Sequence, residues 1–402
     1  MGKVVSQISG MVNRLKEGER VEREKLDFAV RTLRLHSGNP QALGEKAERS
    51  RGRTKWSVPG LTGEGLPTNV QMPFSARDYT VLATDGSHID VDRHRSAPCY
   101  LINIGQVSLT YGKGSDAELG NTPMLYFDES ELILPSPEQG QDGVKIEGAI
   151  LDAKRAVEEC RALAGLVKAA DINVPVIAMM DGSLVLWDLE KQKHPPYVAE
   201  TLITNGMLRY LDDIREVSLR SQVALCSYIS APGSSDVVNL LRVALCPHDS
   251  PDCRRLCEGR PKAEKECEAV ADLRDGAVFA ELLRPGERSA VFESHSRVVD
   301  NHYGVHRVRF FYLNVCDEIA RIEIPKWVAD RPELVELAQS LVFDQCALGD
   351  GYPVALAEAH EKAVVTTGDR EQFWRLVDMV MEGRGMPALN SAKSRSKRRP
   401  FV

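Results

Sequence analysis

Two apolar runs in this chain end in the same three residues, Asp-Gly-Ser, beginning at Asp85 and at Asp181. Each run has the length and composition of a buried strand, so the sequence predicts a carboxylate where each strand ends. A carboxylate beside a core strand is costly to desolvate unless a positive charge compensates it. Two such carboxylates brought together would offer hard oxygen ligands to Mg²⁺ or Mn²⁺. Each copy taken alone is more simply an ordinary turn, and it is the repetition that favours a shared role.

A third carboxylate could come from the segment between the two Asp-Gly-Ser runs, where apolar periodicity predicts a helix over 145–170. Glu158 shares its helical face with basic residues, which predicts a solvated side chain. Glu159 instead lies among apolar neighbours, so it either extends to solvent or joins Asp85 and Asp181. Three carboxylates around divalent cations would suit phosphodiester hydrolysis, which requires an activated water and a stabilised leaving oxygen.

These residues must be positioned by a mixture of strands and helices, which predicts an α/β fold with one main sheet. Apolar and alternating runs predict strands at 79–84, 100–111, 174–180, 222–229, 290–293 and 307–324. Helical periodicity predicts helices at 3–36, 145–170, 198–215, 236–242, 332–347, 354–364 and 370–382. A polar, glycine-containing connector is expected between the first helix and residue 68.

The composition limits the classes of function. The 402 residues are 43% hydrophobic and 27% charged, with a formal net charge of −7, so any contact with nucleic acid must come from a local patch. The sequence contains neither an apolar stretch of membrane-spanning length nor a signal-peptide pattern, and we expect a cytoplasmic protein without membrane contact. Five cysteines in apolar segments are expected to be buried thiols in a reducing compartment. They are Cys99, Cys160, Cys226, Cys316 and Cys346.

The other four cysteines fall in a polar insertion over residues 246–270, where core packing explains them poorly. They are Cys246, Cys253, Cys257 and Cys267. Their spacing, C-x6-C-x3-C-x9-C, matches neither the zinc-ribbon pattern nor the ferredoxin pattern. A second metal site with zinc or an iron–sulfur cluster, free thiols and a disulfide all remain open.

Three further features have a structural and a functional interpretation. Gly351-Tyr352-Pro353 predicts a turn that exposes Tyr352, followed by a helix that carries His360. His360 is either a structural helical histidine or a group that faces the acids. Arg307 and Arg309 share one face of a predicted strand, which is either solvated or lines a substrate channel. The basic stretch 393–399 is either a disordered tail or a DNA contact.

In four stretches the chain resembles the NurA nuclease family. They are the run ending Ala83-Thr84-Asp85-Gly86-Ser87, the helix with Glu159-Cys160-Arg161-Ala162-Leu163 leading to Met180-Asp181-Gly182-Ser183-Leu184, Tyr228-Ile229-Ser230 with Val237-Val238-Asn239-Leu240-Leu241-Arg242, and Gly351-Tyr352-Pro353-Val354-Ala355-Leu356-Ala357-Glu358-Ala359-His360. The resemblance implies an RNase H-like mixed sheet flanked by helices. It also implies a nuclease dependent on manganese or magnesium that acts on DNA ends and single strands. The expected activities are 5′–3′ exonuclease and single-strand endonuclease.

The resemblance also assigns the site. Asp85, Glu159 and Asp181 match the metal-binding acids, and Tyr352 and His360 match the late site residues, with His360 a further metal ligand. It implies a homodimer that works with a HerA-type hexameric ATPase in DNA end resection and double-strand break repair.

The expected organisation is an N-terminal helix and linker over 1–68, a NurA-like nuclease domain over 69–385 and a basic tail over 386–402. Two alternatives stay open: another metal-dependent phosphoryl-transfer enzyme, and a non-catalytic adaptor that binds DNA or a motor ATPase. An aspartyl-phosphate enzyme would form a trappable covalent intermediate, whereas hydrolysis by metal-activated water would not.

Overall fold

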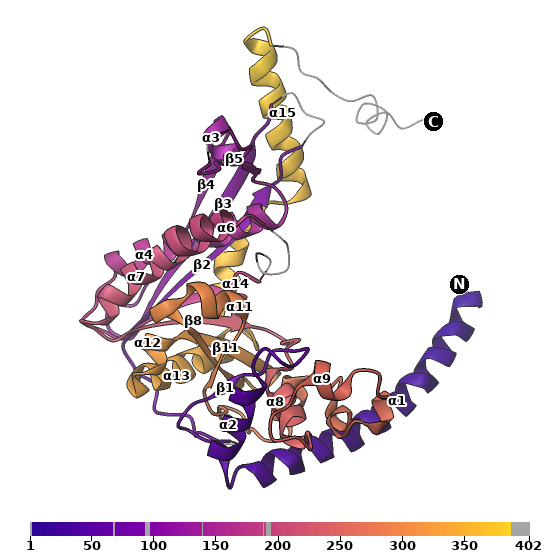
Figure 1. The fold of residues 1–402 in the computed structure, drawn as a ribbon. Helices are drawn as coiled ribbons and strands as arrows, with labels where there is room; N and C mark the ends of the chain where they lie inside the picture. The colour runs from indigo at the N-terminus through magenta and orange to yellow at the C-terminus, as the bar shows by residue number, and fades with distance from the viewer. Residues whose placement is uncertain are drawn as a thin grey trace. The chain divides into compact units, whose positions relative to one another are not determined.

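A computed structural model describes residues 2–66, 69–92, 97–138, 140–187, 189 and 194–386 (Figure 1). The chain forms two compact units. Unit 1 comprises Met1–Ser75, Ser227–Asp300 and Arg307–Gly351, and unit 2 comprises Ala76–Cys226, Asn301–His306 and Tyr352–Val402. The basic stretch 393–399 lies outside the described residues. In the described part of the chain, no helix is both long enough and apolar enough to cross a membrane.

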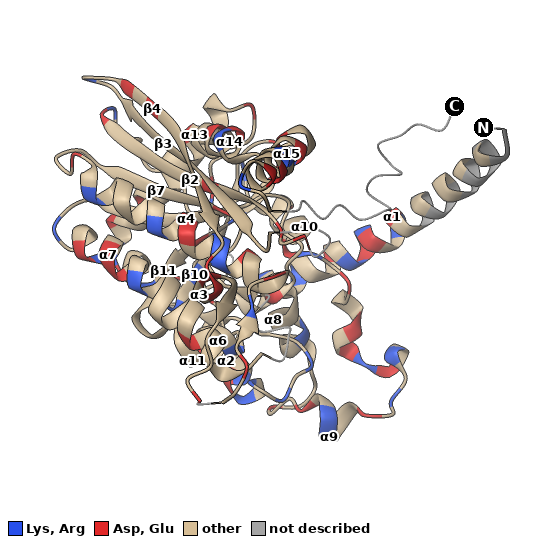
Figure 2. Ribbon diagram, turned by 90° about the horizontal axis from the view of Figure 1, so that it is seen from above, with Lys and Arg blue, Asp and Glu red and all other residues tan. Residues whose placement is uncertain are grey.

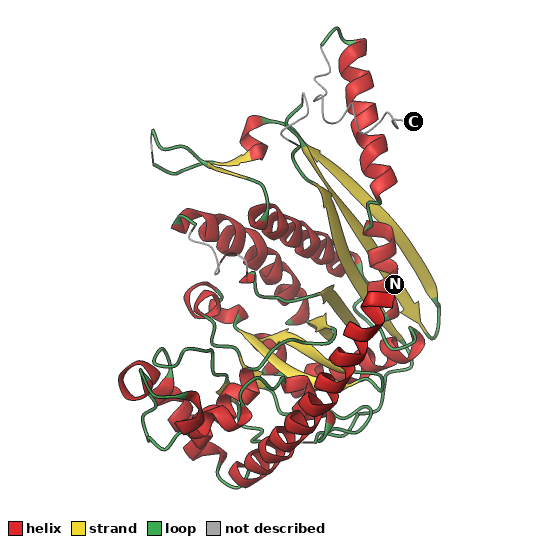
Figure 3. Ribbon diagram, turned by 90° about the vertical axis from the view of Figure 1, so that its right-hand side faces the viewer, coloured by secondary structure: helices red, strands yellow, loops and turns green. Residues whose placement is uncertain are grey.

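Unit 2 contains a mixed sheet with the strand order β7-β2-β3-β4. The long strands β2 (Tyr79–Ile89), β3 (Tyr100–Tyr111) and β4 (Asp116–Tyr126) pair antiparallel, whereas β7 (Val176–Asp181) runs parallel to β2. Helix α4 (Ala149–Ala169) packs on β2, and α14 (Val354–Ala363) packs on β2 and β3. The predicted mixed α/β sheet flanked by helices is therefore confirmed (Figure 3).

The packing of α14 on the sheet depends on one glycine of β3. A Cβ atom at Gly105 would lie 2.0 Å from the carbonyl oxygen of Ala359 and 2.8 Å from the backbone nitrogen of Ala363. Because neither backbone atom can move without moving the helix, only glycine permits this close approach. The residue thereby fixes the height of α14 above the sheet, and with it the position of His360.

The remaining elements of unit 2 are short or extend from the sheet. They are α3 (Glu129–Leu132), β5 (Ile133–Leu134), β6 (Val144–Lys145), α6 (Pro196–Ala199), the π-helical η1 (Glu200–Met207), α7 (Leu208–Ser218), η4 (Gly304–His306) and α15 (Thr367–Gly383). The predicted helix over 198–215 is thus a succession of α6, η1 and α7. Basic and acidic residues both occur along α4 and α7, so neither helix is uniformly basic (Figure 2).

The two Asp-Gly-Ser runs differ in structure, and the prediction that both end a strand is wrong for the first. Strand β2 continues through Asp85, Gly86 and Ser87 to Ile89 and stays paired with β3 throughout. Strand β7 does end at Asp181, where Gly182 turns the chain with a φ of +77°. The first run continues because β3 offers a hydrogen-bonding partner along its whole length.

Unit 1 is built on the strand order β1-β9-β10-β11-β8. Its strands are β1 (Gly60–Leu61), β9 (Phe292–Glu293), β10 (Val308–Asn314), β11 (Ile319–Pro325) and the last residues of β8 (Val223–Ile229). Its helices are α1 (Gly2–His36), α2 (Pro40–Ser50), α8 (Asp236–Leu245), α9 (Cys253–Cys257), η2 (Lys262–Glu264), η3 (Glu266–Val270), α10 (Asp275–Ala280), α11 (Arg297–His302), α12 (Lys326–Ala329) and α13 (Pro332–Leu348). The region before residue 68 is therefore more than the predicted connector, because it contains α2 and β1.

Helix α1 is buried only in part, and one cysteine differs from its predicted burial. The apolar stripe formed by Leu26, Val30 and Leu33 of α1 is buried in the unit 1 core. The earlier stripe on the same helix is exposed, and includes Val4, Ile8, Met11, Val12 and Leu15. Among the five cysteines expected to be buried, Cys316 is exposed, in the turn between β10 and β11, where its φ is +79°.

Candidate functional site

Asp85 lies beside Asp181 on two parallel strands. Thr84 of β2 pairs with Met180 of β7, so the next residue along each strand is an aspartate. Laterally adjacent residues of a sheet project from the same face. On that face the Asp85 carboxylate accepts a hydrogen bond from His360 Nδ1 of α14 at 2.7 Å. The structure therefore brings three of the predicted site residues together.

The carboxylate of Asp181 is held at the point where β7 ends. One of its oxygens accepts a hydrogen bond from the backbone N–H of Gly182 at 2.9 Å. Loss of hydration raises the pKa of Asp181, a hydrogen bond from Tyr352 lowers it, and the negative charge of Asp85 raises it again. Tyr352 thus contacts the site, although it is half-buried and not exposed as its turn had suggested.

Glu159 reaches the same region from the opposite face of β2. Its backbone carbonyl accepts a hydrogen bond from Thr84 Oγ1 at 3.1 Å, which fixes this turn of α4 on the strand. A Cβ atom at Gly86 would lie 2.5 Å from Glu159 Oε1, so the side chain lies directly over this glycine. The functional interpretation of Glu159 therefore fits the geometry better than extension into solvent, because only 6% of the residue is exposed.

The charge of Glu159 is poorly compensated. Its pKa is raised to about 7, mainly by burial; Arg155 lowers the pKa, and the negative charges of Asp85, Asp181 and Asp152 contribute to the rise. The Arg155 Nε lies 3.3 Å from Glu159 Oε1, yet this buried oxygen accepts no hydrogen bond. An acid that is buried beside other acids is typical of a functional site.

Glu158 differs from its neighbour and from its prediction. It is buried, with 3% of the residue exposed, and not solvated. Lys154 Nζ lies 2.7 Å and Arg161 Nε 2.8 Å from its two oxygens. Arg155 of the same helix contacts Glu159 and not Glu158. The two adjacent glutamates therefore have different environments, and only Glu159 is electrostatically linked to the aspartates.

A pocket of about 240 Å³ adjoins these acids. Its lining includes Glu159 and Asp181 together with Arg155, Ser183 and Trp187. Trp187 Nε1 donates a hydrogen bond to Ser183 Oγ at 3.0 Å, which fixes the indole ring in the wall. Sequence reasoning missed Arg155 and Trp187 as site residues. The available signal for Arg155 was its place one helical turn before Glu159.

The donor set suits a hard divalent cation. The carboxylate oxygens of Asp85, Glu159 and Asp181 are ligands that Mg²⁺ and Mn²⁺ prefer, and the imidazole of His360 adds a nitrogen donor beside them. The buried Glu159 Oε1 without a hydrogen bond is an atom that a cation would satisfy. In the described part of the chain, no three His, Cys, Asp or Glu side chains are already arranged to hold a metal ion. Because Asp85 and Asp181 raise the pKa of Glu159, the acids repel one another, and ligation would require them to converge.

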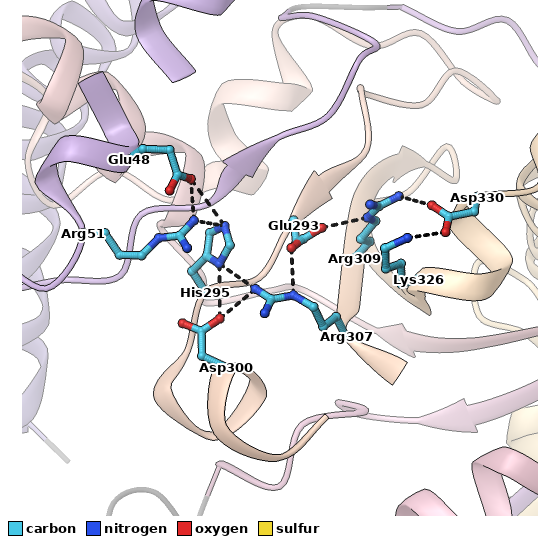
Figure 4. A network of polar contacts seen from close by, with 9 residues as sticks. All are labelled: Glu48, Arg51, Glu293, His295, Asp300, Arg307, Arg309, Lys326 and Asp330. Atoms are coloured by element: carbon cyan, nitrogen blue, oxygen red, sulfur yellow. Dashed lines mark hydrogen bonds and ion pairs between the residues drawn. The ribbon is translucent and has the colours of Figure 1, made fainter. Parts of the chain in front are cut away.

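The predicted arginine face of unit 1 carries its own counter-charges (Figure 4). Arg307 Nε and Arg309 Nε donate to the two oxygens of Glu293 at 2.8 and 3.0 Å, which confirms that both arginines share one face. Arg307 also donates to Asp300, and Arg309 to Asp330, at 2.7 and 2.8 Å. Because three acids pair with these two arginines, the structure offers no unpaired positive charge here for a phosphate backbone.

Unit 2 is thus an α/β structure that gathers three acids, a histidine and a tyrosine at one edge of a mixed sheet. The chain belongs to the NurA family, because the NurA domain model matches residues 79–365. This family is a nuclease family, and the match includes every one of these five residues.

Other comparisons add little to this assignment. A crystal structure of NurA with manganese is 10% identical, with a TM-score of 0.36, and the match covers 84% of this chain and 95% of that chain. A native prototype foamy virus protease–reverse transcriptase is 17% identical, with a TM-score of 0.19, over 40% of this chain and 19% of that chain. No curated protein matches the chain. The family assignment rests on the domain model.

Proposed function

We propose that this protein is a metal-dependent DNA nuclease that hydrolyses phosphodiester bonds at the site formed by Asp85, Glu159 and Asp181. The observation that carries the proposal is the convergence of acids from three elements, since Asp85 and Asp181 lie side by side on β2 and β7 and Glu159 of α4 lies over Gly86. Mn²⁺ or Mg²⁺ is the proposed cofactor, since the donors are hard oxygens and a NurA has been crystallised with manganese. Such ions, when bound, activate water and stabilise the leaving oxygen.

The other residues of the site have positioning roles in this proposal. His360 donates from Nδ1 to Asp85, which orients that carboxylate and leaves Nε2 as an acceptor for a metal ion or a water. Tyr352 hydrogen-bonds Asp181 and orients it in the same way. Arg155, beside Glu159 in the pocket wall, is a candidate contact for a phosphate oxygen. No protein nucleophile is required, so we expect no covalent intermediate.

The family resemblance supports the wider proposal. It includes an RNase H-like core, 5′–3′ exonuclease and single-strand endonuclease activities, and a role in end resection and double-strand break repair. A homodimer and a HerA-type hexameric ATPase are the proposed assembly and partner. Light scattering of the purified chain tests the dimer, and co-purification with a HerA-type ATPase tests the partner.

The test of the nuclease is degradation of labelled single- and double-stranded DNA with Mn²⁺, Mg²⁺ or EDTA. We expect cleavage that requires metal. Asp181→Asn should lower the cleavage rate by more than about 100-fold, because losing a residue that only orients a metal ligand already lowers activity by up to about 100-fold. Asp116→Asn is the matched control, since Asp116 lies on the exposed strand β4. A folded wild-type protein without cleavage, even with the ATPase added, would overturn the proposal and favour the adaptor.

A further inference from the structure

The cysteines of the 246–270 insertion come from three neighbouring elements of unit 1. Cys246 follows the last residue of α8, Cys253 and Cys257 begin and end α9, and Cys267 lies in η3. Residues four apart on a helix share a face, so Cys253 and Cys257 project together. All four are free thiols and all are partly buried.

The ends of α8 and η3 are held together by an ion pair beside two of these cysteines. Arg242, one turn before Cys246 on α8, donates to the carboxylate of Glu268 at 2.6 Å. Glu268 directly follows Cys267, so the pair brings Cys246 and Cys267 to adjoining elements. Both charged side chains are largely buried, with 13% of Arg242 and 21% of Glu268 exposed, which makes the junction more than a surface ion pair.

Helix α9 is tied to the same region through the segment that follows α2. The backbone N–H of Cys253 donates to the carbonyl of Arg53 at 3.0 Å. Three residues later, the ring of Trp56 stacks against the guanidinium of Arg242, with 3.6 Å between the guanidinium carbon and the ring centroid. One arginine therefore contacts both η3 and the segment that holds α9.

The thiols interact with one another. Burial raises the pKa of Cys253 and of Cys267. Cys257 and Cys246 further raise the pKa of Cys253. Cys253 and Cys246 likewise raise the pKa of Cys267. Such interactions act over short distances. Together with the contacts above, they indicate that the four cysteines lie in one region of unit 1.

The cluster has a positive side. Lys46 Nζ donates to the carbonyl of Cys246 at 2.6 Å and to that of Ala244 at 3.2 Å. The buried Nε of Arg242 donates no hydrogen bond. Arg242 lowers the pKa of Cys253 and of Cys267, and Lys46 interacts with Cys246, so both cations would stabilise negative charge on the cluster.

We propose that Cys246, Cys253, Cys257 and Cys267 form a tetrathiolate metal centre whose occupant is Zn²⁺. Thiolates are soft ligands that select zinc or iron–sulfur clusters over the hard cations of the acidic site. Zn²⁺ would replace four thiol protons, which pass to solvent, and leave a centre with a net charge of −2 that Lys46 and Arg242 partly offset. In the described residues these thiols are not yet arranged as metal ligands, so binding must close the cluster.

The role of the centre follows from what it would connect. It would cross-link the end of α8, α9 and η3, and through Arg53 the segment after α2, in a stretch that has few core residues of its own. The acids proposed for hydrolysis belong to unit 2, so the centre is a structural site of unit 1. Its existence does not depend on the nuclease proposal.

The experiment is elemental analysis of the full-length protein, purified without an affinity tag under reducing conditions. We expect about one zinc per chain, falling to background in the double variant Cys253→Ser, Cys257→Ser. Cys316→Ser is the matched control, because this exposed cysteine lies outside the insertion and should leave the zinc content unchanged. Iron with acid-labile sulfide, lost in the same double variant, would keep the tetrathiolate centre but overturn zinc as its occupant.

A second measurement keeps the proposal testable if the double variant misfolds. Cobalt reconstitution of the wild-type chain should give the visible bands of tetrahedral cobalt thiolate, and these should disappear when zinc is added. The four thiols should resist alkylation until a chelator is added. A metal-free wild type whose four cysteines are alkylated equally with and without chelator, or are joined as disulfides, would overturn the proposal.

Discussion

Neutralising Glu159 should stabilise the metal-free protein at alkaline pH. The pKa of this buried carboxyl is raised from 4.5 to about 7 by burial and by Asp85, Asp181 and Asp152, although Arg155 lowers it. The folded state therefore holds the proton more tightly than the unfolded state. Its contribution to stability is fully present below pH 4.5 and is lost as the pH rises through about 7. The loss amounts to about 3 kcal/mol, at about 1.4 kcal/mol for each pH unit between the two pKa values.

Glu159→Gln removes this titration and keeps the shape of the protonated acid. In EDTA, the variant and the wild type should have similar thermal unfolding midpoints near pH 5. At pH 8 the variant should unfold about 6–12 °C higher, since 1 kcal/mol shifts the midpoint of a domain of about 150–250 residues by about 2–4 °C. Differential scanning calorimetry at both pH values measures the difference.

Glu158→Gln is the matched control, because it removes the adjacent buried carboxylate. That carboxylate contacts Lys154 and Arg161, so its loss at pH 8 should lower the free energy of unfolding by about 1–2 kcal/mol. The two neutralisations should therefore have opposite signs. Equal or lower stability of Glu159→Gln at pH 8 would refute the inference that Glu159 is repelled by the acids around it.

Three other outcomes follow from the same contacts. Mn²⁺ at about 100 times its Kd should stabilise the wild type by about 2.7 kcal/mol, and Asp85→Asn should abolish this shift in calorimetry. Tyr352→Phe removes the hydroxyl that orients Asp181 and should lower the rate of metal-dependent DNA cleavage by about 10–100-fold, without loss of fold by circular dichroism. Gly86→Ala places a Cβ atom 2.5 Å from Glu159 Oε1, so it should lower the free energy of unfolding, measured with denaturant, by about 1–3 kcal/mol. It should also weaken Mn²⁺ binding, measured by calorimetric titration.

Much of the fold could be predicted because its elements have strong local patterns. The helices carrying Glu159 and His360 and the strand ending at Asp181 lie within a few residues of their predicted bounds. Asp85 and Asp181 could be predicted as site residues because both follow the same kind of apolar run and a buried carboxylate is costly unless it is compensated. The association of both aspartates with His360 is a long-range contact, for which the family resemblance supplied the only signal.

What the sequence did not predict depends on partners far along the chain. The length of β2 beyond Asp85 follows from β3, whose Asn103 pairs with Ser87. The burial of Glu158 depends on how α4 lies against the sheet, which the composition of its helical face did not reveal. The environment of Glu159 likewise depends on Gly86, because a side chain there would occupy the position of the carboxylate.

The site arises from the different lengths of two parallel strands. Beside β2, strand β7 stops at Asp181, so among the described residues no strand pairs with β2 on that side beyond Asp85. Side chains from opposite faces of a sheet are normally separated by the sheet itself. Where the neighbouring strand ends, Glu159 from one face and Asp85 and Asp181 from the other can interact. Extending β7 past Asp181 would close this edge, which explains why the second Asp-Gly-Ser run must turn at Gly182 while the first remains in its strand.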